Sequence, residues 1–244
     1  MKIIASDYDG TVNCNGISQR DAEAITKFRE AGNKFGIVTG RDLDMALWVL
    51  FEFKKVKTKI DFLICCTGAI ILNGDGEIIK IKKGKVLPEH HEMIKKAREL
   101  GVNSFNFNDG LKRIYIDPNG KIPYDLDCIP EFTQLNVWFM SNESADKFNA
   151  YINENYANVI SAYRNGGSVD MPPANTSKVT GIYDYASQFD SPEIYTVGDN
   201  LNDIPMIEEF CGFAVSNAQD AVKKSAKHQC DRVADMIEII MEEK

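Results

Sequence analysis

Near its start the chain reads Lys2-Ile3-Ile4-Ala5-Ser6-Asp7-Tyr8-Asp9-Gly10-Thr11, an apolar run that ends in two carboxylates separated by one residue. A second acidic segment, Gly198-Asp199-Asn200-Leu201-Asn202-Asp203, follows the apolar run Ile194 to Val197. Short apolar runs of this kind are typical of buried parallel strands. Because open α/β sheets bind ligands at the carboxyl ends of their strands, the two segments predict a site at one sheet edge.

An isolated Asp-x-Asp-Gly segment is also compatible with a solvated turn, because Asp and Gly suit turn dihedrals. A calcium loop is a second simple alternative. It requires glycine at its sixth position and glutamate at its twelfth, whereas counting from Asp7 gives Val12 and Ser18. The calcium loop is therefore excluded. The choice between a solvated turn and a functional site depends on the residues elsewhere in the chain that would lie beside Asp7 and Asp9.

The wider pattern concerns the fold. Short apolar runs alternate with helical periodicity, which predicts βαβ units and a Rossmann-like, doubly wound parallel sheet of the α/β class. The first unit joins the strand ending at Ser6 to a helix that begins after the capping residue Ser18 and ends near Gly32. The next strand is expected at Lys34 to Val38, and Thr39-Gly40-Arg41-Asp42 forms the turn that brings further side chains to the acidic edge.

The pattern changes in the middle of the chain. From about residue 82 to residue 167 the strand signals become longer and more alternating, as in Phe132 to Met140, which predicts an inserted α+β domain. The βα rhythm returns with Ser168 to Met171. We therefore expect a catalytic core made of residues 1–82 and 168–244, interrupted by a cap at residues 83–167 that sets substrate specificity.

The composition excludes several classes of partner. The formal charge is -8 and no basic stripe is present, so most of the surface would repel nucleic acid. No apolar run approaches the roughly 20 residues of a membrane span. Residues Met1 to Ser6 lead directly into Asp7 without the apolar segment of a secretion signal, which predicts a cytoplasmic protein.

The acidic residues indicate phosphoryl-transfer chemistry. Asp7, at the end of a strand, can attack phosphorus and form an acyl phosphate. Asp9 can protonate the leaving alkoxide and later deprotonate water. Because the attack faces repulsion from a dianionic phosphate, a divalent cation is expected, with Asp199 and Asp203 as hard oxygen ligands. Magnesium is the first choice.

Other residues can stabilise the transferring phosphoryl oxygens. Thr39 offers a hydroxyl group, Lys178 a fixed positive charge, and the backbone near Gly10 and Gly40 additional N–H donors. Each is uninformative alone, because threonines beside a strand usually cap the next helix and lysines are usually solvated. Their order and spacing carry the information.

Together these residues resemble the motifs of haloacid dehalogenase-like phosphatases. The four motifs occur in order as Asp7-x-Asp9-Gly10-Thr11, Thr39-Gly40-Arg41, Lys178, and Gly198-Asp199 with Asn202-Asp203. The insertion, followed by Val169-Asp170-Met171-Pro172 before the lysine, is similar to the Cof-type subgroup with a type IIB cap. The resemblance covers essentially the whole chain.

The resemblance implies a role for each site residue. Asp7 would be the nucleophile and a magnesium ligand, and Asp9 the acid/base, with its backbone carbonyl on the metal. Asp199 would bind the ion directly, and Asp203 would act from nearby or through water. The phosphoryl group would be held by Thr39, Gly40, Lys178 and Asn202.

Some positions depart from the subgroup pattern. Thr67 stands where asparagine is common, Asp42 where proline is frequent, and Val179 where glycine is usual. None of these changes removes a catalytic group. Whether Arg41 and Thr67 contact substrate stays open at this point.

The main hypothesis is a magnesium-dependent phosphatase that hydrolyses a small phosphorylated metabolite, for example a sugar phosphate, through a phosphoaspartate. A phosphomutase or phosphotransferase would share this intermediate but protect it from water. A non-enzymatic phosphometabolite-binding switch would use the same groups without rapid turnover. Asp9 argues against the switch, because a second carboxylate that activates water accelerates loss of the phosphoryl group. The oligomeric state is left open.

Overall fold

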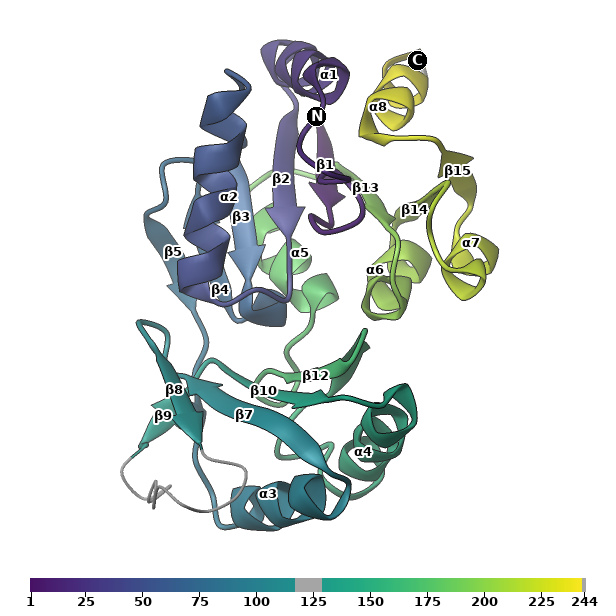
Figure 1. Cartoon of the computed structure of the whole chain (residues 1–244). Coiled ribbons are helices and arrows are strands. Elements are labelled where there is room, and N and C mark those ends of the chain that lie inside the picture. The colour runs from purple at the N-terminus through teal and green to yellow at the C-terminus, as the bar shows by residue number, and fades with distance from the viewer. Residues whose placement is uncertain (117–128, 243–244) are drawn as a thin grey trace.

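The computed structural model describes residues 1–116 and 129–242, which form two main sheets with separate apolar cores (Figure 1). The larger sheet consists, from edge to edge, of β15 (His228–Cys230), β14 (Cys211–Val215), β13 (Glu193–Gly198), β1 (Lys2–Ser6), β2 (Lys34–Val38), β3 (Phe62–Cys65), β4 (Ile70–Asn73) and β5 (Ile78–Ile81). Both ends of the chain therefore contribute strands to this sheet.

Most of the larger sheet is parallel. Every strand from β15 through β3 runs parallel to its neighbour, whereas β4 and β5 return as an antiparallel hairpin at one edge. All four residues of β3 are buried. A strand that is apolar and buried along its whole length needs cover on both faces.

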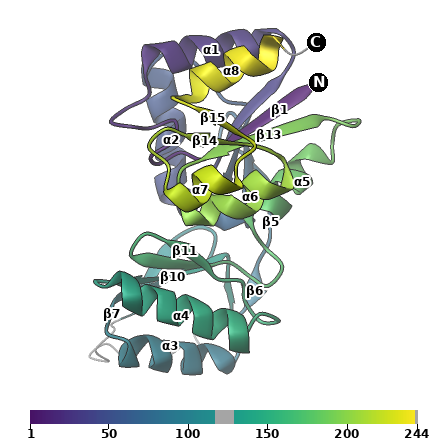
Figure 2. The same cartoon turned by 90° about the vertical axis from the view of Figure 1, so that its right-hand side faces the viewer.

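Helices cover both faces of the larger sheet. They are α1 (Gln19–Glu30), α2 (Leu43–Lys55), α5 (Lys178–Ala186), α6 (Ile204–Glu209), α7 (Asp220–Ser225) and α8 (Val233–Glu242), with α1 and α8 side by side (Figure 2). Phe35 of β2 packs on Phe53 of α2, with ring centroids 6.4 Å apart. Phe62, which lies against the neighbouring Gly36, stacks on Tyr185 of α5 at 3.9 Å. Because successive strand residues point to opposite faces, these helices lie on opposite sides, and the predicted double winding is confirmed.

The smaller sheet is antiparallel throughout. In spatial order its strands are β11 (Tyr163–Asn165), β12 (Ser168–Met171), β10 (Gln134–Phe139), β7 (Val102–Asn108) and β8 (Arg113–Ile116). A separate two-stranded ribbon is formed by β6 (Gly84–Lys85) and β9 (Glu131–Phe132). Helices α3 (Glu89–Glu99) and α4 (Asn142–Asn155) cover one face of the smaller sheet, where Phe105 and Phe107 are buried. The alternate residues Asn106 and Asn108 point to the opposite, polar face.

One strand lies in a different sheet from the one expected. The sequence places Ser168 to Met171 in the returning core, but β12 pairs antiparallel with β10 and β11 in the smaller sheet. Val169 and Met171 are buried in the smaller apolar cluster, and the polar residues Ser168 and Asp170 alternate with them. This alternation suits an antiparallel sheet with one apolar face. The expected placement of the strand is wrong, while the domain boundaries themselves stay a prediction.

Candidate active site

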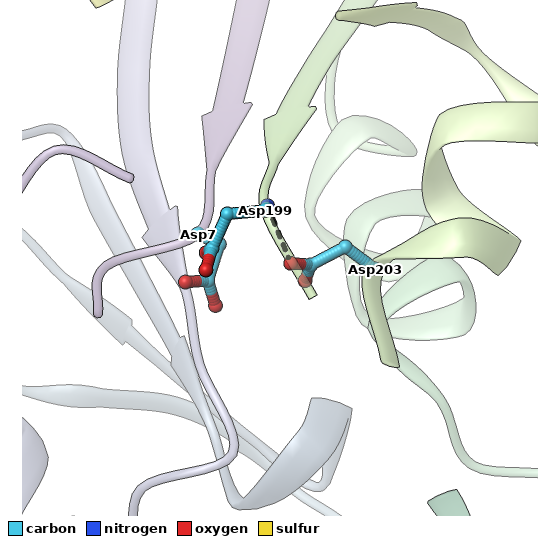
Figure 3. Close-up of side chains that lie close together, drawn as sticks. All are labelled: Asp7, Asp199 and Asp203. Carbon is cyan, nitrogen blue, oxygen red and sulfur yellow. Dashed lines mark hydrogen bonds between the residues drawn. The ribbon is translucent and has the colours of Figure 1, made fainter. Parts of the chain in front are cut away.

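Asp7 and Asp199 stand side by side because they follow neighbouring parallel strands (Figure 3). Strands β1 and β13 pair with Ser6 opposite Val197, and the Asp7 backbone N–H donates to the Val197 carbonyl at 2.9 Å. The hydroxyl of Thr11 donates to Asp199 Oδ1 at 2.8 Å. The two acidic segments of the sequence therefore meet at one edge of the sheet.

Asp203 joins them from the short 3-10 helix η3 (Leu201–Asp203). Its Oδ2 accepts a hydrogen bond from the Asp199 backbone N–H at 3.1 Å, drawn as a dashed line in Figure 3. Gly198 permits this close turn, because a Cβ at that position would lie 2.5 Å from the Asp203 Cβ. Carboxylate oxygens of Asp7, Asp199 and Asp203 lie within 4.8 Å of one another, and we call these three carboxylates the acidic cluster.

Lys178 bridges two members of the acidic cluster. It is the first residue of α5, whose N-cap Ser177 forms a capping box with Thr180. Its Nζ lies 2.5 Å from Asp7 Oδ1 and 2.6 Å from Asp203 Oδ1, and its side chain is only 2% exposed. A buried ammonium group needs such partners, because its desolvation is costly.

Burial and mutual repulsion change the protonation of these groups. Burial, and then the charge of Asp203, raise the pKa of Asp7 well above its ordinary value, although Lys178 opposes the shift. Burial also raises the pKa of Asp199, against the hydrogen bond from Thr11. For Lys178 burial lowers the pKa, but the charges of Asp203 and Asp7 outweigh this and the pKa is raised overall.

The acidic cluster can hold a metal ion. Its three carboxylates outnumber the single ammonium group of Lys178, so the fully ionised cluster has a surplus of negative charge. Carboxylate oxygens are the ligands that hard divalent cations prefer. The loop after β1 can pass close to the acidic cluster because residue 10 is glycine. A Cβ at Gly10 would collide with the carboxylate of Asp199.

Asp9 lies outside the acidic cluster and is held by Arg41. The guanidinium group donates from Nε to Asp9 Oδ2 at 2.7 Å and from Nη2 to Oδ1 at 2.6 Å, so the pair is bidentate. The same guanidinium lies 4.8 Å from the ring centroid of Tyr8. The Asp9 side chain is 55% exposed. Arg41, left open by the sequence, thus contacts the acid/base candidate.

Thr39 and Gly40 lie in the turn between β2 and α2. The Thr39 backbone N–H donates to the Ile64 carbonyl at 2.8 Å, and its Oγ1 accepts from the Arg41 backbone N–H at 3.2 Å. A Cβ at Gly40 would lie 2.5 Å from Asp170 Oδ2. The close approach between this turn and the smaller sheet therefore requires glycine.

Asn202 precedes Asp203 in η3 and is buried. Its Oδ1 has no hydrogen-bond partner among the residues that the structure describes. Asn202 is thus the sequence neighbour of one member of the acidic cluster, Asp203. Its expected contact with phosphate stays a prediction.

The smaller sheet reaches the site with residues that belong to none of the sequence motifs. Gln134 Nε2 donates to the Gly40 carbonyl at 2.8 Å, and the Thr67 hydroxyl donates to Gln134 Oε1 at 2.8 Å. Asn200 Nδ2 donates to Asn165 Oδ1 at 3.2 Å. The available signal in the sequence is the alternation of carboxamides with apolar residues in β7 and β10, which marks a polar sheet face.

Asp170 is a buried carboxylate on this polar face. Asn165 Nδ2 donates to its Oδ2 at 2.9 Å, and Asn136 Nδ2 donates to its Oδ1 at 2.7 Å. Burial raises the pKa of Asp170, although these two hydrogen bonds oppose the shift. Burial therefore makes the ionised form of Asp170, which lies against Gly40, energetically unfavourable.

Known proteins share this architecture. The family model of the haloacid dehalogenase-like hydrolases matches residues 4–236. A 5-amino-6-(5-phospho-D-ribitylamino)uracil phosphatase from Bacillus subtilis is 27% identical over 238 residues, covering 95% of this chain and 90% of the relative. A HAD/COF-like hydrolase from Plasmodium vivax has a TM-score of 0.80 at 19% identity, covering 100% of this chain and 96% of that one. A subclass IIB sugar phosphatase has a TM-score of 0.76 at 19% identity, covering 99% of both chains.

Proposed function

Since the chain belongs to the haloacid dehalogenase-like hydrolase family, we propose that it is a magnesium-dependent phosphatase that hydrolyses a small phosphorylated metabolite through a phosphoaspartate at Asp7. The observation that carries the proposal is the buried contact of Lys178 Nζ with Asp7 and Asp203, beside Asp199. A nucleophilic carboxylate, a fixed positive charge and a set of cation ligands are the groups that phosphoryl transfer needs.

The first step forms the phosphoaspartate. An oxygen of Asp7 attacks phosphorus, and the bond from phosphorus to the ester oxygen breaks. Asp9 gives its proton to the departing oxygen, so an alcohol leaves. Lys178, with Nζ already 2.5 Å from Asp7 Oδ1, offsets the negative charge of the transferring group.

The second step returns the enzyme to its starting state. Asp9, now ionised, takes a proton from water while the water oxygen attacks the phosphorus of the acyl phosphate. The bond between phosphorus and the Asp7 oxygen breaks, phosphate leaves, and the carboxylate of Asp7 is regenerated. One residue can therefore serve first as acid and then as base.

Thr39, Gly40 and Asn202 would hold the phosphoryl oxygens. Thr39 offers its hydroxyl group and Gly40 its backbone N–H from the turn after β2. Asn202 would donate from its Nδ2 amide group, because an anionic phosphoryl oxygen accepts hydrogen bonds and needs an N–H or O–H donor.

Magnesium would be held by Asp7, Asp199 and the backbone carbonyl of Asp9, with Asp203 acting on it from nearby or through water. When bound, it supplies positive charge between Asp7 and the anionic substrate and so reduces their repulsion. The oxygen-only donor set supports Mg²⁺ over softer metals.

We assign the smaller sheet and its helices, within residues 83–116 and 129–171, to a cap over this site. Two hydrogen bonds support the assignment, from Gln134 to Gly40 and from Asn200 to Asn165. The separate apolar core of this part of the chain also supports it. In the proposal the polar face of the cap contacts the leaving group and excludes water.

The substrate class rests on the relatives. The Bacillus subtilis relative is named as a 5-amino-6-(5-phospho-D-ribitylamino)uracil phosphatase and the subclass IIB enzyme as a sugar phosphatase, and a sugar phosphate is our first candidate. Within the described residues, 1–116 and 129–242, no helix has the length and apolar character that crossing a membrane requires. The cytoplasmic location and the exclusion of nucleic acid stay predictions.

A phosphate-release assay tests the proposal. Wild-type protein would be given an aryl phosphate and a panel of phosphometabolites, with Mg²⁺ or with EDTA, beside the Asp7→Asn variant. We expect release by the wild type with Mg²⁺ alone, and a loss of kcat of at least about 10³-fold in the variant, as removal of a nucleophile costs elsewhere. Undiminished turnover by a folded Asp7→Asn variant would contradict the nucleophile, and isomer formation in place of phosphate release would indicate a mutase.

A further inference from the structure

We infer that Arg41 is the positioning residue of the acid/base Asp9 and fixes the plane of its carboxylate without contacting the substrate. The inference rests on the proposed function, which gives Asp9 its role. It starts from the bidentate contact, in which Nε and Nη2 of Arg41 each donate to a different Asp9 oxygen at 2.7 and 2.6 Å. Two parallel hydrogen bonds determine the orientation of a carboxylate, which a single bond leaves free to rotate.

Asp9 needs such support because of where it lies. The backbone of its loop is fixed by hydrogen bonds from Asn13 N–H to the Tyr8 carbonyl at 2.9 Å and from Gly10 N–H to the Asn13 carbonyl at 3.2 Å. These bonds do not restrain the Asp9 side chain, which is 55% exposed. A proton donor that rotates freely spends little time aimed at the ester oxygen, and misplacement lowers the rate.

Arg41 is anchored well enough to orient another group. Its backbone N–H donates to Thr39 Oγ1 at 3.2 Å, and its carbonyl accepts from the Cys66 N–H at 2.8 Å. Its guanidinium lies 4.8 Å from the ring centroid of Tyr8, and that ring is buried. The planar guanidinium thus connects the turn after β2 to the acid/base on the loop after β1.

The contact is compatible with proton transfer. A carboxylate offers about four lone-pair positions, and the guanidinium occupies one on each oxygen of Asp9. The remaining lone pairs can carry the proton that passes to the ester oxygen as its bond to phosphorus breaks. Arg41 keeps all of its protons throughout, because arginine is not deprotonated in proteins.

A direct contact between Arg41 and the substrate phosphate would have different consequences. It would stabilise every phosphate ester alike, and it would also strengthen binding of inorganic phosphate. Positioning of Asp9 matters only where the leaving oxygen needs a proton. An alkyl ester needs that proton, because an alkoxide is a poor leaving group, whereas p-nitrophenolate departs readily without it.

The experiment compares benzyl phosphate with p-nitrophenyl phosphate, two esters of similar size. We expect Arg41→Gln to lower kcat/KM by about 10²-fold for benzyl phosphate, as misplacement of a reacting group does, and only slightly for p-nitrophenyl phosphate. The inhibition constant of inorganic phosphate should not change. Arg41→Lys should recover little, because lysine keeps the charge but cannot form the planar, two-pronged contact.

Arg29→Gln is the matched control, because Arg29 makes a similar bidentate contact with Asp61, at 2.7 and 3.1 Å, away from the acidic cluster. It should leave the ratio of the two kcat/KM values unchanged. Equal losses on both esters in Arg41→Gln, a weaker affinity for phosphate, or full rescue by lysine would overturn the inference while leaving the proposed function intact. Failure of the wild type to hydrolyse these two esters and every member of the phosphometabolite panel would overturn both.

Discussion

Lys178 is the residue on which the charge balance of the site depends. Its Nζ is buried 2.5 Å from Asp7 and 2.6 Å from Asp203. Removing one partner of a buried ionic group is strongly destabilising, because the remaining charges are left unpaired in a poorly solvated place. The sequence pointed to Lys178 through its order among the motifs. Its contact with Asp203 depends on the turn at η3, which no local pattern shows.

Replacing Lys178 by Met should abolish turnover and, in EDTA, lower the free energy of unfolding by about 3–5 kcal/mol, the cost of breaking a buried pair. Mg²⁺ should restore part of this stability because it offsets the unpaired carboxylates. Urea unfolding with and without Mg²⁺ measures both effects. Lys80→Met is the control, since the half-exposed Lys80 lies 2.8 Å from Asp184 and such surface pairs contribute at most about 1 kcal/mol. Equal costs for the two lysines would contradict this account.

Asp170 should make the stability depend on pH. Burial raises its pKa above the ordinary value of 3.8, so the folded protein holds this proton more tightly than the unfolded chain does. The resulting stabilisation is complete below 3.8 and is lost as the pH rises through the raised pKa. Asp170→Asn, which stays neutral, should therefore gain free energy of unfolding relative to wild type as the pH rises. Urea unfolding at several pH values would refute the prediction if this difference were constant or moved the other way.

At the scale of elements, local signals located most strands and helices but not all strand partners. The helix expected after Ser18 is α1, and the Ser18 side chain accepts from the Asp21 N–H as an N-cap. The strands before the two acidic segments are β1 and β13 of the parallel sheet. The strand Ser168 to Met171 was expected in the wrong sheet, although one of its two partners, β11, directly precedes it in the chain and only β10 is remote. Its alternating pattern was the available signal.

The contact between the turn after β2 and strand β12 gives a prediction at this scale. Gly40→Ala would place a Cβ 2.5 Å from Asp170 Oδ2, so the two elements must separate. We expect a loss of about 1–3 kcal/mol in the free energy of unfolding, typical of overpacking, together with lower kcat. Combining it with Asp170→Ala should remove part of the penalty, as a double-mutant cycle can measure. Additive losses would show that the contact is not responsible.

At the scale of the whole molecule, the site lies where distant parts of the chain meet. Strands β1 and β13 and the start of α5 bring together Asp7, Asp199 and Lys178, and the turn after β2 carries Thr39 at the same edge of the sheet. The order of the motifs along the chain predicted this group, because a parallel sheet collects its strand ends at one edge. The contact of Gln134 with Gly40 could not be predicted in the same way, since it depends on how the two sheets are placed relative to each other.

The covalent intermediate is the central claim, and trapping it is the most direct measurement. Wild-type protein would be mixed with Mg²⁺ and a radiolabelled substrate found by the phosphate-release assay, quenched with acid within the first turnover, and digested for mass spectrometry. We expect a hydroxylamine-sensitive phosphoryl group on the peptide that contains Asp7, and none in Asp7→Asn. Turnover by the wild type without any protein-bound phosphoryl group, or with the label on another residue, would contradict the account.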